Sequence, residues 1–480
     1  MREFWTGAEL EYERLLRDVR PALERGPAEM QRGGGLLLDL AGYQLDDVPR
    51  MAHFAGSRPH QRVRRRAFAQ LSDALEDDVG KPLLQWLADD VLLMPGRHSM
   101  ARRYVALYLT ARNKTDAGRM ALLSVARDEA DALRPAVLEA MTAWPDDAID
   151  LFLVGLIGKK FDKRARPHPF NVLLKRVRNV DVPLGARASG MLEVRAQAML
   201  ISTDWREASR AIELARGLDA ERRVPLLIDA LSAWDRRGKM GTGSRRILDD
   251  IVLELREISG RSIGTNPKNW ITWWIAVRQG QTPLHVADAE EGQEARSSAT
   301  FFGLRPVTDR VTFIIDISGS MEARWATQEH SRYQEAIEQM TRFLQAIGED
   351  ARFNVILFSG APLRSSPHLV PASTETLAKA RNSLLARAPG GGTYLRPAVE
   401  RALRLDKHGD MDIERLEADS IIVLCDGETT DGPAWVRPLL DRIGTESRIR
   451  FHCVLIGNQD DGTLAQLAAG TGGDYVRVGQ

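Results

Sequence analysis

Cysteine is almost absent from this chain, since its 480 residues include only Cys425 and Cys453. Both lie in short apolar runs that predict buried strands, where a thiol is a packing group rather than a cross-link. A disulfide framework is therefore not expected. The sequence fits a compartment in which thiols stay reduced.

An excess of either charge is also missing. Lys and Arg together number 66, as do Asp and Glu, so the formal net charge is zero. This balance does not indicate a protein that binds nucleic acid through an overall positive charge. Two basic clusters, at Arg62–Arg66 and within Lys159–Arg178, could contact phosphates locally, but acidic residues elsewhere in the helices favour solvated helix faces.

Long hydrophobic runs are missing as well. The nearest candidate, Leu151–Ile157, is far too short to span a membrane. The N-terminal residues MREFWTGAELEYERLL contain neither an apolar core nor the small-residue cleavage site of a signal peptide. We therefore expect a cytoplasmic protein, provided that no natural leader precedes this sequence.

Motifs of the common enzyme classes do not occur. The sequence has no H-E-x-x-H and no C-x-x-C, so it predicts no zinc site, and it has no Walker, kinase or triad motif. The glycine-rich segment Gly238–Arg246 lacks the spacing of a phosphate-binding loop, and we interpret it as a turn between helices. The prediction is a protein that is not an enzyme.

From about residue 35 to 260 the sequence has the apolar periodicity of short amphipathic helices separated by polar turns, and we assign residues 1–279 to one helical domain. Helix pairs recur at roughly 33–40 residues, the range of helical solenoids, and we predict HEAT-like repeats. The basic segment Gly158–Val180 contains two prolines and is predicted to be a long loop or domain seam. The tryptophans of GTNPKNWITWW (264–274) could dock a second domain, but a cap on the last repeat is favoured, because terminal repeats need atypical faces.

Residues 280–306 lose this periodicity, and their acidic and polar composition predicts a flexible linker. From residue 307 to 480, short apolar runs alternate with amphipathic helices. Runs such as VTFIID, RFNVILF, SIIVLC and RFHCVLI indicate strands buried on both faces of a mostly parallel sheet. The alternation predicts a doubly wound, Rossmann-like α/β domain, whose ligands bind at the carboxyl ends of the strands.

Oxygen-bearing side chains lie on three predicted loops of this domain. The first predicted strand ends in DISGSM, which supplies Asp316, Ser318 and Ser320 on one tight loop. Thr393 follows three glycines in PGGGTYL, and Asp426 follows the strand SIIVLC directly. Carboxylates and hydroxyls without His or Cys favour a hard cation, Mg²⁺ or Mn²⁺, over zinc.

The elements DISGSM, GGTYL and VLCDGE resemble the motifs of von Willebrand factor A (vWA) domains in identity, order and spacing. The resemblance covers about a third of the chain, from about residue 307 to 476. It implies a metal-ion-dependent adhesion site (MIDAS), in which the two serines and the threonine ligate the ion and the aspartates bind it directly or through water. The Trp-rich segment before the linker is similar to segments of bacterial proteins that join HEAT-like repeats to such a domain.

The resemblance implies a binding function, in which an acidic side chain of a protein partner completes the coordination of the ion. We therefore expect a non-enzymatic scaffold. One alternative is an RNA-binding protein of the Ro type (TROVE module), which also places a helical ring before a vWA domain. Another is an accessory subunit of a MoxR-like AAA+ ATPase. The sequence leaves the partner and the oligomeric state open.

Overall fold

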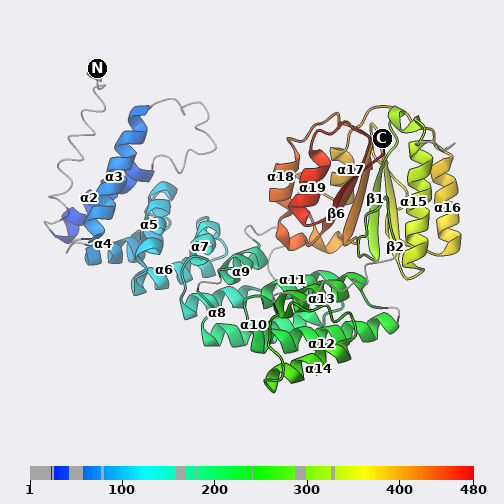
Figure 1. Ribbon diagram of the computed structural model, residues 1–480. Coiled ribbons are helices and arrows are strands. Elements are labelled where there is room, and N and C mark those ends of the chain that lie inside the picture. Colours follow the sequence, from blue (N-terminus) through cyan, green and yellow to red (C-terminus); the bar gives the residue numbers. More distant parts are fainter. Residues whose placement is uncertain are drawn as a thin grey trace. The chain divides into compact units, whose positions relative to one another are not determined.

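The computed structural model describes residue 23 and residues 26–42, 58–76, 80–157, 168–179, 182–240, 242–286, 299–325, 330–409 and 411–479. Two compact units can be distinguished: Met1–Lys159 with Val172–Ala188, and Lys160–Asn171 with Ser189–Gln480. An all-helical region is followed by an α/β domain, which confirms the predicted fold class (Figure 1). The HEAT-like character of the helices stays a prediction.

The helical region runs from α2 to α14. Its elements are α2 (Pro27–Gly42), α3 (Arg58–Glu76), α4 (Gly80–Trp86), the π-helical η2 (Leu87–Leu92), α5 (Met100–Asn113), α6 (Asp116–Arg127), α7 (Arg134–Met141), α8 (Asp147–Leu156), α9 (Pro169–Val177), α10 (Ala186–Leu200), α11 (Trp205–Ala215), α12 (Ala220–Lys239), α13 (Arg245–Ser259) and α14 (Pro267–Arg278). No helix in the described ranges is long and apolar enough to cross a membrane.

Short polar side chains start several of these helices at the predicted turns. Ser99, Thr115 and Asp146 stand just before α5, α6 and α8, and each accepts a hydrogen bond from a backbone amide of the first turn. Such caps satisfy amides that have no partner inside the helix. The polar turns of the sequence therefore set the helix boundaries.

The loop predicted for Gly158–Val180 is wrong for part of its length. Residues 158–167 lie outside the described residues, but Pro169–Val177 form helix α9. Phe170, Leu173, Leu174 and Val177 are buried at helical spacing, and proline is tolerated in the first turn of a helix. The apolar spacing thus outweighs the basic composition and the prolines that favoured a loop.

The tryptophans before the linker lie on α14. Trp270 is fully buried, and its indole N–H donates to the Gly264 carbonyl at 2.6 Å. Trp273 is also buried and packs edge-to-face on Trp270, with ring centroids 5.6 Å apart. Because α14 packs on α12, these rings belong to the helical region, as the cap interpretation requires.

The α/β domain contains a seven-stranded sheet of order β3-β2-β1-β5-β6-β7, with β4 paired to β2. The strands are β1 (Arg310–Asp316), β2 (Arg352–Phe358), β3 (Leu363–Arg364), β4 (Val370–Pro371), β5 (Ser420–Cys425), β6 (Arg450–Ile456) and β7 (Tyr475–Val478). β1, β2, β5, β6 and β7 pair in parallel, whereas β3 and β4 run antiparallel to β2. The four predicted strands are therefore confirmed.

Helices cover both faces of this sheet (Figure 1). They are α15 (Arg332–Ile347), α16 (Thr374–Leu385), α17 (Arg396–Ala402), α18 (Val436–Ile443) and α19 (Thr463–Thr471), with the 3-10 turns η3 (Gly319–Glu322), η4 (Ile413–Arg415) and η5 (Thr445–Ser447). Phe313 packs in one core with α15 and α16, whereas its neighbour Ile314 packs in the other core with α17, α18 and α19. The alternation along a fully buried strand explains its continuous apolar sequence.

The apolar packing of the α/β domain begins before residue 307. Within the predicted linker 280–306, residues 287–298 lie outside the described residues. Ala299, Phe301, Phe302 and Leu304 are buried in the core formed with α15. The stretch before β1 thus contributes core side chains, and the predicted domain boundaries stay a prediction.

Helix α13 contacts the amino ends of the strands. Arg246 is 1% exposed, and its guanidinium donates to the carbonyls of Asp419, the residue before β5, and Arg448, two residues before β6. Arg450, the first residue of β6, donates to Asp250 of α13 at 2.5 Å. The helical side of this unit therefore meets the edge of the sheet opposite to the one where ligands usually bind in such folds.

Candidate metal centre

Two neighbouring strands deliver the predicted aspartates to one edge of the sheet. β1 ends at Asp316, and β5 ends one residue before Asp426. The strands are parallel, with Ile315 opposite Leu424. Their carboxyl ends therefore lie together, and the loops that follow them adjoin.

Asp316 forms the buried floor of the site. It is fully buried and accepts a hydrogen bond from the Ser318 amide at 2.7 Å and one from the Cys425 thiol at 3.3 Å. Burial is the main cause that raises the pKa of Asp316 to about 6. In the described residues its hydrogen-bond donors are neutral groups, so the carboxylate has no direct cationic partner.

A chain of polar contacts joins Asp316 to the solvent-exposed rim. The Ser318 and Ser320 hydroxyls are 3.0 Å apart, and Ser320 donates to Asp426 Oδ1 at 2.7 Å. Ser318 and Asp426 are buried, whereas Ser320 is exposed. The structure thus brings four of the five predicted site residues into one connected group that opens to solvent at Ser320.

Thr393, the fifth predicted residue, lies on a loop that is hydrogen-bonded to the loop after β1 and to the loop after β5. The backbone of this loop bonds to the first loop through Gly390 N to Ile317 O at 2.7 Å. Beyond Asp426, Thr430 N donates to the Thr393 carbonyl at 2.8 Å. The Thr393 hydroxyl has no hydrogen-bond partner in the described part of the chain, so its oxygen is available to coordinate a metal ion.

Arg332 is a charged neighbour that the sequence analysis missed. It is the first residue of α15, and its guanidinium donates to Asp426 Oδ2 at 2.8 Å. The Arg332 side chain is 27% exposed, and that of Asp426 is 2% exposed. The two residues are 94 positions apart along the chain, and no periodicity in the sequence signals the contact.

The donor set fits a hard divalent cation. The set combines two carboxylates with three hydroxyls. Clusters of three or more His, Cys, Asp or Glu side chains that could hold a metal do not occur in the described ranges, so no site of that other kind competes with it. Oxygen donors of this kind suit Mg²⁺ or Mn²⁺. A buried carboxylate without a direct cationic partner, as at Asp316, is also unfavourable unless a cation approaches it.

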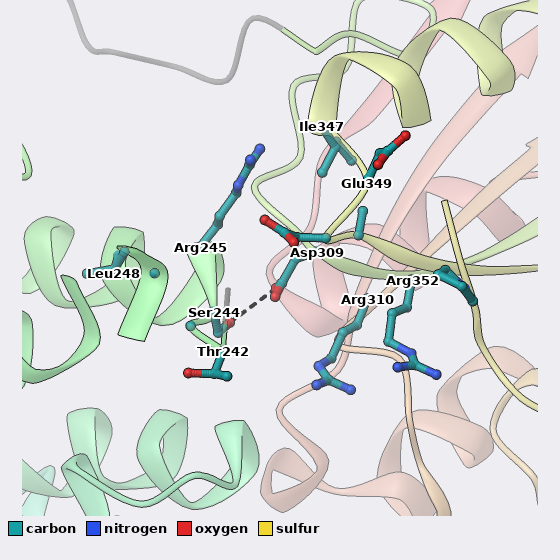
Figure 2. Close-up of a pocket in the computed structure, with 14 residues that line it drawn as sticks. Thr242, Ser244, Arg245, Leu248, Asp309, Arg310, Ile347, Glu349 and Arg352 are labelled. Carbon is teal, nitrogen blue, oxygen red and sulfur yellow. Dashed lines mark hydrogen bonds between the residues drawn. The ribbon is translucent and has the colours of Figure 1, made fainter. Parts of the chain in front are cut away.

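A polar cavity lies at the other end of the sheet, near the start of α13 (Figure 2). It has a volume of about 350 Å³ and presents Arg245, Arg310 and Arg352 together with Asp309 and Glu349. This mixture of charges matches no single class of ligand. The glycine-rich segment 238–246 joins the end of α12 to the start of α13, as predicted, and its residues Gly238, Thr242, Gly243, Ser244 and Arg245 line the cavity.

The fold and the loops define a doubly wound α/β domain with an oxygen-lined site at the carboxyl edge of β1 and β5. Residues 311–428 match the family described as von Willebrand factor type A domain, and this range includes all five predicted site residues. The chain therefore contains a vWA domain. Domains of this family are commonly protein-interaction modules with a MIDAS.

Curated relatives match this part of the chain. Inter-alpha-trypsin inhibitor heavy chain H4 of Homo sapiens is 31% identical over 182 residues, which are 37% of this chain and 19% of the relative. Heavy chain H3 of Homo sapiens is 30% identical over 132 residues, which are 27% of this chain and 14% of the relative. The chain thus spans less than a fifth of the length of either relative.

A solved structure with a longer match is the RO (RSR) protein of Deinococcus radiodurans. It is 15% identical, with coverage of 95% of this chain and 87% of that chain, and a TM-score of 0.23. At so low a TM-score the match carries no argument about function.

Proposed function

We propose that the vWA domain binds one divalent cation, Mg²⁺ or Mn²⁺, through Asp316, Ser318, Ser320, Thr393 and Asp426. The bound ion then engages an acidic side chain of a protein partner. The observation that carries this proposal is the chain of contacts from buried Asp316 to solvent-exposed Ser320 and on to Asp426. When bound, the ion supplies a positive charge that attracts a carboxylate.

Hydrogen bonds within the chain orient the carboxylates of such a site. The Ser318 amide fixes the orientation of the Asp316 carboxylate, and Ser320 does the same for Asp426 through its hydroxyl. Three separate loops hold the donors, so the site is organised by the fold of the domain rather than by one flexible segment. Preorganised donors bind an ion without a large ordering cost.

The proposal is a binding function without catalysis. Cys425, whose thiol contacts Asp316, is fully buried. Burial raises the pKa of this thiol well above its ordinary value, so it stays protonated and is a poor nucleophile. Since the sequence also lacks Walker, kinase and triad motifs, we propose that the full chain lacks ATPase, phosphatase and protease activity.

RNA binding receives no specific support from the described residues. Within the basic cluster Lys159–Arg178, residues 159–167 lie outside the described residues. Arg176 is 1% exposed and pairs with Asp150, so it is not a phosphate-binding group on the surface. In the cluster Arg62–Arg66, the side chains of residues 62–64 also lie outside the described residues.

We retain the division into a helical region 1–279, a linker 280–306 and a vWA domain 307–480 as part of the proposal.

Calorimetric titration of the full chain with Mn²⁺ tests the metal site. Asp316→Ala removes the buried carboxylate and should abolish binding, whereas Asp441→Asn, at an exposed carboxylate on α18, should leave it unchanged. Circular dichroism checks that both variants fold. Equal Mn²⁺ affinity in the wild type and Asp316→Ala would disprove the assignment.

The second half of the proposal needs a probe for carboxylates. Water-proton relaxation of the Mn²⁺-loaded chain reports the water molecules on the ion. Acetate should displace one of them and lower the relaxation enhancement, whereas neutral acetamide should not. If the ion binds but acetate leaves the relaxation unchanged, the site holds a metal without recognising carboxylates.

A further inference from the structure

Arg332 places a fixed positive charge beside the candidate metal centre. Its backbone is anchored at both sides, because Arg332 N donates to the Ala323 carbonyl at 2.9 Å and Ser331 caps α15 with a full capping box. The side chain reaches Asp426 Oδ2 at 2.8 Å. Arg332 therefore enters the site from a rigid helix start rather than from a loop.

The guanidinium keeps unused hydrogen-bonding capacity. An arginine has five N–H donors, and in the described residues the side chain of Arg332 makes one hydrogen bond, to Asp426. The side chain is 27% exposed, so solvent reaches part of it. A planar fork of this kind is suited to a carboxylate.

The net charge of the site also favours a carboxylate ligand. Asp316 and Asp426 would together neutralise a divalent ion, which would leave little attraction for an anion. Arg332 adds one positive charge, so the loaded site would carry a net charge of one. This is the complement of a single carboxylate.

We propose that Arg332 is a second binding group for the acidic side chain of the partner. One carboxylate oxygen is held by the ion and the other by the Arg332 guanidinium. This inference rests on the proposed metal site and adds a specificity-determining residue to it. It also makes Arg332 a mild competitor of the metal, because its positive charge repels the cation that it serves.

The alternative is that Arg332 only positions Asp426. The two roles predict different changes in metal affinity when Arg332 is replaced. A residue that only positions a ligand of the metal should, when replaced, weaken the binding of both metal and carboxylate. A carboxylate-binding residue should, when replaced, weaken carboxylate binding while metal binding stays equal or becomes tighter.

The test uses the full chain with Mn²⁺ and acetate as probes. In Arg332→Gln, Mn²⁺ affinity should rise by about 3-fold, and acetate affinity of the Mn²⁺-saturated protein should fall by about 10-fold. Arg332→Lys keeps the charge but loses the fork, so Mn²⁺ affinity should stay near wild type and acetate affinity should be intermediate. Arg437→Gln, at an exposed arginine of α18, removes the same charge at another place and should change neither.

Parallel loss of both affinities in Arg332→Gln would overturn the inference and leave Arg332 as a positioning residue. Unchanged affinities would overturn it too. Arg332→Lys gives an independent answer if Arg332→Gln does not fold, since wild-type acetate binding in a chain without the fork would contradict the proposal. A wild-type chain that binds no Mn²⁺, or binds Mn²⁺ but not acetate, would instead refute the proposed function itself.

Discussion

Asp150 and Arg176 form a fully buried ion pair between α8 and α9. Both residues are 1% exposed, and two hydrogen bonds of 2.8 Å join the guanidinium to the carboxylate. Burial is the main cause that raises the pKa of Asp150, whereas the hydrogen bonds and the charge of Arg176 act in the opposite direction. A buried ion pair adds little net stability, because the cost of removing both charges from water offsets much of their attraction.

We expect Arg176→Met to destabilise the α8–α9 pair by about 3–5 kcal/mol, because it leaves a buried carboxylate unpaired. The double variant Asp150→Leu/Arg176→Met should recover most of this loss, since two apolar groups need no partner. Hydrogen exchange of α8 and α9, followed by mass spectrometry, measures the local effect. Equal losses in the single and double variants would show that packing, not charge, determines the stability.

At the scale of residues, sequence motifs predict some side-chain positions and not others. Asp316, Ser318 and Ser320 are close in sequence on one strand-end loop, and Asp426 follows the neighbouring strand, so the parallel topology predicts that they meet. The contact of Arg332 with Asp426 depends on where α15 begins in space. No local pattern in the sequence encodes that position.

At the scale of elements, apolar periodicity was the most reliable signal. The segment RYQEAIEQMTRFLQAI has apolar residues at helical spacing and forms α15, one face of which packs on the sheet. Apolar periodicity was overruled at α9, where prolines and basic residues suggested a loop although the apolar residues have helical spacing. The short strands β3 and β4, of two residues each, carry no periodicity and were not predicted.

Helix α14 provides a test of the cap interpretation. Trp270→Ala removes a fully buried ring and the indole N–H that bonds to Gly264, so we expect a loss of about 3–5 kcal/mol in local stability. Trp274→Ala, at a partly buried ring of the same helix, should cost clearly less. Hydrogen exchange should show the loss of protection in α12 and α14. Loss of protection confined to the sheet would instead indicate that Trp270 supports the vWA domain.

At the scale of the larger compact unit, the contacts between α13 and the strands suggest that helices and sheet unfold together. Arg246 is fully buried against two backbone carbonyls, and burial lowers its pKa to about 10. A charged group in such a place is costly unless the contacts around it stay intact. The sequence predicted two modules joined by a flexible linker, and it could not reveal these contacts, because they join residues about 170 to 200 positions apart.

These contacts should also make the stability of this unit depend on pH. Asp309 accepts a hydrogen bond from Ser244, the residue before α13, at 3.2 Å. Burial, and after it the neighbouring Asp419, raises the pKa of Asp309 to about 7, although Arg310 and Ser244 act in the opposite direction. The folded state therefore holds a proton that the unfolded chain, with an ordinary pKa near 3.8, releases earlier.

The raised pKa sets the direction of the effect. The stabilisation is complete below about pH 4 and is lost as the pH rises through about 7, at a slope of at most about 1.4 kcal/mol per pH unit. We expect Asp309→Asn, which cannot ionise, to make the dependence between pH 4 and 7 less steep, with the buried Asp316 still contributing, whereas Asp350→Asn, at an exposed carboxylate beside the same cavity, should keep the wild-type slope. Urea unfolding at several pH values, monitored by hydrogen exchange of α13 and β1, measures both slopes. If Asp309→Asn keeps the wild-type slope, another group controls the pH response.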